Sequence, residues 1–246
     1  MLTGFWKLTW IETKVFVREP MGLVGLLIVP VIVFLVAGWA VGAGPPSAGV
    51  AGPPFNVPVL AALSIAVSAV QSLVAIMSIY REGGILKRLR ATPLSPVTIL
   101  SAHVFVKLTF TVLGLALLVL AGRQFFPGAM AVGLVSFTLA VLLSTLSILS
   151  LGFIIASVVP TARFAQPISG ALLYPMVAFS GLFFPLQVLP VPLRIVANAL
   201  PTTHAAALME GIWDGAGWGA HTGSVLALVV IGGVCTLVST KVFRWE

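Results

Sequence analysis

Residues 128–159 read GAMAVGLVSFTLAVLLSTLSILSLGFIIASVV and contain no charged side chain. A helix needs about 20 apolar residues to cross the hydrocarbon core of a bilayer. This stretch is longer, so we expect a membrane span that tilts or extends past the membrane surface. Over the 246 residues of the chain, 59% are hydrophobic and only 8% are charged, against about 25% charged residues in soluble domains. The solvent for this fold is therefore the lipid bilayer, and one membrane domain accounts for most of the chain.

Apolar windows of spanning length occur six times along the sequence. They are residues 21–42, 57–80, 104–122, 128–159, 166–184 and 222–243. We predict an all-α integral membrane protein with six transmembrane helices in a domain covering residues 21–246. Two shorter helices are predicted between the fifth and sixth spans, at 193–200 and 203–213, on the extracytoplasmic side.

The first 20 residues have the pattern of an amphipathic helix lying in the membrane interface. The basic side chains of this segment share one helical face, and apolar side chains share another. The basic face carries Lys7, Lys14 and Arg18, and the apolar face carries Leu8, Ile11 and Val15. We expect this segment to anchor the protein to the membrane, to form part of a docking surface for a cytoplasmic partner, or to do both.

The basic residues predict the orientation of the spans, because cytoplasmic segments are enriched in Lys and Arg. If the N-terminus lies inside, only Arg123 and Arg194 of the 13 Lys and Arg residues fall on the outer side. The reverse orientation would place most of the positive charge outside. We therefore predict a multi-pass protein of the cell membrane with both termini in the cytoplasm. The net charge of +7 is explained by this topology, without nucleic acid as a partner.

The cytoplasmic loop after the second window is the most informative connection. Residues 81–95 read REGGILKRLRATPLS, a short amphipathic stretch bounded by Gly83-Gly84 and Pro93. Topology alone needs only scattered basic residues, whereas a compact element between turn residues indicates a rigid knob presented to the cytoplasm. Ser95-Pro96 then has the pattern of a helix start.

These residues resemble a known family. The stretch 81–95 is similar to the loop after the second span of ABC-2 type permeases, the membrane subunits of ATP-driven exporters. Residues 180–185, SGLFFP, with Leu189-Pro190 and Leu200-Pro201 beyond them, resemble the segment after the fifth span of that family. The resemblance is strongest to the drug-efflux branch of the daunorubicin-resistance type, with nodulation-type and polysaccharide-exporting permeases as near relatives.

The resemblance implies a coupling helix at 82–91 that docks into a groove of a separate ATPase subunit. Two permeases and two ATPases would form the transporter, and ATP and Mg would bind to the ATPases and not to this chain. The residues implied in coupling are Arg81, Glu82, Gly83, Leu86, Lys87, Arg88, Leu89 and Arg90. The implied function is outward movement of a small amphipathic drug- or antibiotic-like compound, and thus a role in drug efflux and antibiotic resistance.

The chemistry of the chain agrees with an outside energy source. No phosphate-binding loop of the Gly-x-x-x-x-Gly-Lys-Ser/Thr type is present. The six windows contain no Asp or Glu, whereas proton-driven transporters usually need an ionisable group at membrane depth. His204, Glu210, Asp214 and His221 match no usual metal-ligand spacing, and the single Cys235 forms no metal framework. We therefore expect a transport subunit that is not an enzyme.

Small and polar side chains align along two of the predicted spans. These positions include Ser64, Ser68, Gln71 and Ser72 in the second span, and Ser136 and Ser144 in the fourth. Such faces allow close packing and hydrogen bonding between membrane helices. They would alternatively line the path of the substrate. A four-residue repeat, Gly211, Gly215, Gly219 and Gly223, indicates either close helix packing or a flexible loop.

Three other readings remain open from the sequence. An ABC-2 permease could carry a lipid-linked or polysaccharide substrate. A non-catalytic channel or assembly partner would show passive conductance instead of nucleotide-dependent flux. An intramembrane serine protease would need a Ser/His pair at membrane depth, but His103 and His221 lie at span ends and no Gly-x-Ser-x-Gly elbow occurs.

Overall fold

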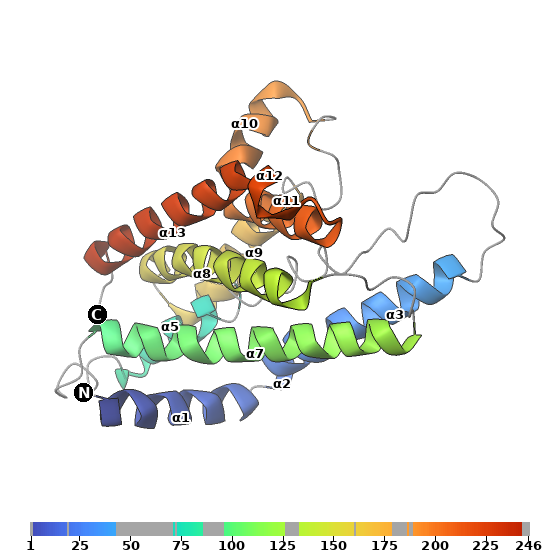
Figure 1. Ribbon diagram of the computed structural model, residues 1–246. Coiled ribbons are helices and arrows are strands. Elements are labelled where there is room, and N and C mark those ends of the chain that lie inside the picture. The colour runs from blue at the N-terminus through green and yellow to red at the C-terminus, as the bar shows by residue number, and fades with distance from the viewer. Residues whose placement is uncertain are drawn as a thin grey trace.

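A computed structural model describes residues 2–18, 20–42, 71, 73–85, 96–125, 133–159, 161–178, 186 and 189–242. The regular secondary structure of these residues is helical, which confirms the predicted all-α class. Three long helices dominate the bundle in Figure 1: α7 (Pro96–Phe125), α8 (Leu134–Val158) and α13 (Thr222–Val242). Helix α8 packs against both of the others.

Each of these long helices contains a stretch that is long and apolar enough to cross a membrane. The candidate spans are Ser101–Phe125, Leu134–Val158 and Thr222–Ser239. They correspond to the predicted windows 104–122, 128–159 and 222–243. Helix α8 starts at Leu134, so its helical part has 25 residues and a length of about 38 Å. A tilted helix of that length fits a hydrocarbon core of about 30 Å.

The first window folds as three consecutive helical pieces. They are α2 (Pro20–Leu23), the π-helix η1 (Val24–Ile28) and α3 (Val29–Gly42). Pro30 has no N–H and cannot donate to the carbonyl of Leu26, so the α-helical ladder cannot continue through this point. The helix instead forms a wider, π-helical turn with one extra residue, in which the N–H of Val29 bonds to the carbonyl of Val24. The apolar helical run here, Val24–Val36, is shorter than a full span.

The second and fifth windows are described in part. The end of the second forms α5 (Leu73–Glu82), and residues 57–70 lie outside the described part of the chain. Helix α9 (Ala162–Ala178) covers most of the fifth window and contains Pro167 and Pro175. The six predicted spans therefore include segments that this structure does not describe, or describes only in part.

Among the described residues, three shorter helices lie between α9 and α13. They are α10 (Val191–Ala199), α11 (Pro201–Trp213) and α12 (Gly217–Ala220). The first two overlap the segments 193–200 and 203–213 that were predicted to be helical. Each begins at or beside a proline, since the first turn of a helix needs no N–H donor there.

The glycine repeat in this region does not form one continuous helical face. Gly215 has a φ of +82° and ends α11, so the four glycines belong to different elements. Only Gly211 makes a close approach, because a Cβ at this position would collide with the ring of His221.

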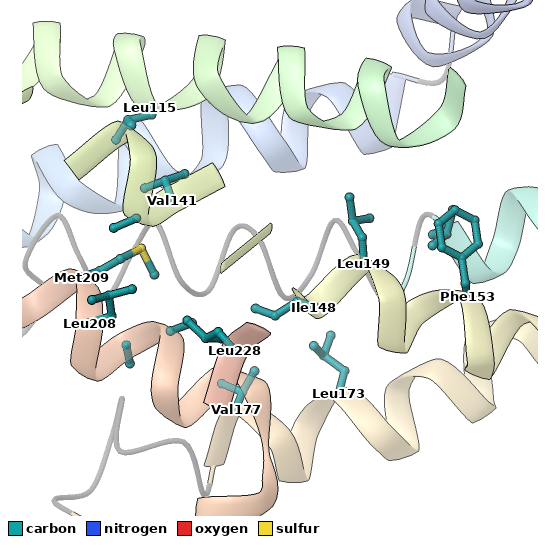
Figure 2. Packing of buried hydrophobic residues seen from close by; sticks show 14 of the residues in the cluster. Leu115, Val141, Ile148, Leu149, Phe153, Leu173, Val177, Leu208, Met209 and Leu228 are labelled. Atoms are coloured by element: carbon teal, nitrogen blue, oxygen red, sulfur yellow. The ribbon is translucent and has the colours of Figure 1, made fainter. Parts of the chain in front are cut away.

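Helix α8 is the central helix of the bundle. It is 67% buried along its apolar window, whereas the windows in α7 and α13 are 33% and 17% buried. Figure 2 shows side chains of several helices meeting around it, among them Leu115, Val141, Leu173, Leu208 and Leu228. The outer face of α13 exposes apolar side chains such as Leu226 and Val230, as expected for contact with lipid.

Candidate functional site

A tight turn ends α5 where the predicted coupling segment begins. The N–H of Gly83 bonds to the carbonyl of Ile79 at 2.9 Å, and the N–H of Gly84 bonds to the carbonyl of Arg81 at 3.1 Å. Gly84 has a φ of +65°, a conformation that residues with a side chain rarely adopt. Ile85 is helical again, and residues 86–95 lie outside the described part of the chain. Of the eight predicted coupling residues, the structure thus describes Arg81, Glu82 and Gly83.

Arg81 ties the end of α5 to the end of α8. Its guanidinium donates hydrogen bonds to the carbonyls of Ala156, at 2.9 Å, and of Val159. The last carbonyls of a helix have no partner within the helix, and the negative end of the helix dipole favours a cation. Because Ala156 and Val159 are fully buried, Arg81 supplies hydrogen bonds that water cannot replace.

A second contact joins α5 to α1 (Leu2–Arg18) and α7 through buried polar side chains. The hydroxyl of Tyr80 donates to the carboxylate of Glu12, with distances of 3.2 and 3.3 Å to its two oxygens. His103 Nδ1 lies 3.2 Å from Glu12 Oε2. Lys107 is buried one turn further along α7, with its ammonium 4.3 Å from the ring centroid of Phe16. We call Glu12, Tyr80, His103 and Lys107 the polar cluster.

The polar cluster lies on the face of α1 that packs against α7, and this face shares Leu8 with the predicted apolar face. Leu8, Glu12 and Phe16, each four residues apart, point toward α7 and are at most 7% exposed. Ile11, also on the predicted apolar face, is 53% exposed, as a side chain in contact with lipid would be in an interfacial helix. Glu12 was missed by the sequence reasoning. The sequence signal for its burial was that a large apolar residue stands four positions before Glu12 and another four positions after it, Leu8 and Phe16.

Burial controls the ionisation of the Glu12 carboxyl. Desolvation raises its pKa to about 7, in spite of the Tyr80 hydrogen bond, which lowers it. His103 and Lys107 face this carboxyl from α7, and α2, which also packs against α1, has no titratable side chain. Between pH 4.5 and 7 the folded protein therefore binds more protons at this site than the unfolded chain, so its stability falls as the pH rises.

We expect the Glu12→Gln variant to lose this pH dependence. A pKa shift from 4.5 to about 7 is equivalent to about 3 kcal/mol of stability, fully present below pH 4.5 and lost as the pH rises through 7. The melting temperature of the wild-type protein in detergent should fall by about 5 °C or more between pH 5 and pH 8. Glutamine keeps an acceptor for Tyr80 and cannot ionise, so the melting temperature of the variant should not fall over this range. Asp214→Asn, at an exposed site, is the matched control and should retain the wild-type slope.

The side chains predicted to line a path or pack helices are described in part, and their role stays a prediction. Ser144 lies in the middle of α8 and is completely buried, and Ser136 lies two turns earlier and is half-buried. Gln71 is half-buried before the start of α5. Ser64, Ser68 and Ser72 lie outside the described residues.

Comparison with known families agrees with this arrangement. A sequence model of the ABC-2 type transporter family matches residues 3–212. The chain belongs to the ABC-2 type transporter family. The matched part runs from α1 to the end of α11, so this permease carries both the polar cluster and the Arg81 contact within the family domain. A comparison with curated proteins found no match.

Family membership defines the general role of the permease. A chain with an ABC-2 membrane domain is a multi-pass membrane protein and acts as a transport subunit. Such a subunit is generally not catalytic and generally works with an ATP-binding partner. The two contacts at the end of α5 therefore lie where the domain passes from the membrane bundle into the loop with the predicted coupling residues.

Proposed function

We propose that this permease is the membrane subunit of an ATP-driven exporter that moves an amphipathic drug- or antibiotic-like compound outward. Two copies of the chain would pair with two ATPase subunits, which bind ATP and Mg. Family membership supports the ATP-binding partner. The lack of Asp and Glu in the apolar windows supports an outside energy source and an amphipathic cargo.

The observation that carries the proposal is the double attachment of α5 just before the loop. Arg81 holds the end of α8, and Tyr80, the preceding residue, holds α1 and α7 through Glu12 and His103. An ATPase that moves residues 81–95 would therefore move three helices of the bundle together. Coupling between distant sites needs such a contiguous and rigid connection to an element with two states.

The proposed topology has six spans, with α1 in the cytoplasmic interface of the cell membrane and both termini in the cytoplasm. Exposed aromatic side chains on α1 support this placement, because tryptophan prefers the membrane interface. Trp6 and Trp10 are 55% and 62% exposed, and the ammonium of Lys14 lies 5.1 Å from the ring centroid of Trp10. Helices α10 and α11 would then lie on the extracytoplasmic side.

A charge reversal in the loop tests the docking of the ATPase. The triple variant Glu82→Lys, Lys87→Glu and Arg88→Glu should reduce recovery of the ATPase with the tagged permease by about tenfold or more, because like charges across an interface are strongly unfavourable. The amount of permease in the membrane should not change. The control variant carries Arg123→Glu and Arg194→Glu, two exposed positions assigned to the other side. Wild-type ATPase recovery and transport in the triple variant would rule out this docking site.

The ATPase itself can be found by purifying the tagged permease from native membranes in mild detergent. A near-stoichiometric protein with a phosphate-binding loop is the expected companion in mass spectrometry. Repeated recovery without any ATPase, under conditions that preserve a known exporter complex, would instead favour a channel or an assembly partner.

A further inference from the structure

Helix α1 has a buried face and an exposed face that do not overlap. The buried residues Leu8, Glu12 and Phe16 point toward α7, as described above. The exposed residues lie on the opposite side, within an arc of about 140° when each residue turns the helix by about 100°. They are Trp6, Lys7, Trp10, Ile11, Lys14, Val17 and Arg18.

The exposed face contains two neighbouring strips along the helix. The apolar strip consists of Trp6, Trp10 and Val17. The basic strip consists of Lys7, Lys14 and Arg18. The strips are in contact, because the ammonium of Lys14 lies 5.1 Å from the ring centroid of Trp10. The one acidic residue within Leu2–Arg18 is Glu12, which is buried on the other face, so the exposed face of α1 carries only positive charge.

The packing of α1 places these strips where a membrane span ends. Leu8 shares a buried cluster with Ala102, and the carboxylate of Glu12 lies 3.2 Å from Nδ1 of His103. Ala102 and His103 are within about 3 Å of the start of the candidate span Ser101–Phe125 along the helix axis. Figure 1 shows α1 beside the first half of α7. The middle of α1 therefore lies at the boundary between lipid headgroups and acyl chains.

The two strips together match the chemistry of an anionic phospholipid. Tryptophan rings prefer the boundary between headgroups and acyl chains, and long basic side chains reach phosphates while their stems lie along apolar surface. Each basic residue near an anionic leaflet strengthens the attraction about fivefold. Three of them on one strip should therefore favour anionic over zwitterionic lipid on the order of 100-fold before screening by salt.

We propose that the basic strip of α1 binds the phosphates of anionic phospholipids while the apolar strip lies against their acyl chains. The proposal rests on the placement of α1 in the cytoplasmic interface given above, and it needs neither the ATPase nor the cargo. The opposite face of the same helix holds Glu12 of the polar cluster. Bound lipids would hold that face against α7 and α5, so the charge of the leaflet regulates the contact between α1 and the helix that leads into the loop.

Photolabelling of the whole permease tests the charge preference. The protein is reconstituted in mixed vesicles of phosphatidylcholine and phosphatidylglycerol with a trace of one photoreactive lipid. The two probes are a phosphatidylglycerol and a phosphatidylcholine that carry the same photoreactive group near the ester end of one acyl chain. Mass spectrometry should find α1 of the wild type labelled about fivefold or more by the anionic probe relative to the zwitterionic one. Raising the salt from 0.1 M to 1 M should lower this ratio, because the Debye length falls from about 10 Å to about 3 Å.

Charge removal on α1 tests the basic strip itself. In the triple variant Lys7→Gln, Lys14→Gln and Arg18→Gln the ratio should fall close to one. All three side chains are exposed, so the melting temperature in detergent should stay that of the wild type. The control variant Arg123→Gln and Arg194→Gln removes exposed positive charge outside α1 and should keep the wild-type ratio.

The two strips should differ in what they contribute. Replacing Trp6 and Trp10 with alanine should lower the labelling of α1 by both probes, because the rings hold the helix at the depth of the photoreactive group. The ratio between the probes should remain well above one, since the basic strip is still present. Equal loss of the ratio in the tryptophan and the charge variants would refute the separate role of the basic strip.

The remaining outcomes separate this proposal from the placement on which it rests. Equal labelling of wild-type α1 by both probes would overturn the anionic preference and leave α1 in the interface. No labelling of α1 by either probe would contradict the interfacial placement and the proposal together. An unchanged ratio in the triple charge variant, with reduced recovery of the ATPase, would assign the basic strip to a protein partner instead.

Discussion

Replacing Arg81 with alanine is expected to abolish most nucleotide-driven transport while the ATPase subunit stays bound. The side chain supplies two charge-assisted hydrogen bonds to buried carbonyls at the end of α8. Bonds of this kind contribute about 1.5 to 3 kcal/mol each. If that connection carries the motion of the loop into α8, its loss would slow transport by about 10- to 100-fold.

The measurement is uptake of a fluorescent amphipathic dye into inside-out vesicles, together with ATP hydrolysis by the same complex. The ratio of dye moved to ATP hydrolysed should fall in Arg81→Ala, whereas simple unfolding would remove both activities. Arg81→Lys should give a partial effect, because lysine cannot make the planar double contact of a guanidinium. Arg123→Ala removes an exposed arginine and should behave like the wild type. An unchanged ratio in Arg81→Ala would show that the α5–α8 contact does not couple.

The Gly114→Leu variant is expected to lose about 3 kcal/mol of stability, at the upper end of the usual cost of overpacking. Gly114 lies where α7 meets η1. A Cβ at this position would be 3.1 Å from the carbonyl oxygen of Leu26 and 3.3 Å from Cδ2 of Leu27. Both neighbours are buried, and one contact is with backbone, so α7 would have to move away from the first span. That movement would open the cluster in which Phe16 of α1 also packs.

Thermal unfolding in detergent tests this expectation. The melting temperature of Gly114→Leu should fall by about 6 to 12 °C for a chain of this size. Gly114→Ala should show a smaller decrease in the same direction. Gly223→Leu, at an exposed position with free space around a Cβ, is the control and should melt like the wild type. A Gly114→Leu protein with unchanged stability would mean that α7 and η1 are not in close contact.

The long helices could be predicted from the sequence because their signal is local. Windows of apolar residues located α7, α8 and α13, and Pro96 marked the start of α7. Proline also marked the starts of α10 and α11. These features depend on the residues of one segment alone, so no knowledge of neighbouring helices was needed.

The faces of the helices could not be predicted in the same way. In a bilayer, the lipid and the protein interior are both apolar, so hydrophobicity does not distinguish the two surroundings of a helix. Leu8 and Ile11 belong to one predicted apolar face of α1, but Leu8 is buried and Ile11 is exposed. Glu12 is buried because Tyr80 and His103 provide partners for its carboxyl. Those partners come from two other helices, and their proximity to Glu12 is a property of the fold.

The coupling role of Arg81, Glu82 and Gly83, which the family resemblance implies, stays a prediction. The structure places Arg81 in contact with α8. The use of Arg81 as a cap for another helix could not be deduced, because it depends on where α8 ends in space. The interruption of the first span at Pro30 was also missed, although a proline in the middle of an apolar window is its local cause.

The central position of α8 has a consequence for how the protein is made. Its neighbours α11 and α13 follow it along the chain, so a ribosome delivers α8 to the bilayer first. At synthesis rates of about 5–20 residues per second, α13 emerges on the order of ten seconds later. During this interval the hydroxyls of Ser144 and Ser147, buried in the finished bundle, lack the helices that enclose them. The surroundings of these two hydroxyls are therefore complete only when α13 has joined the bundle.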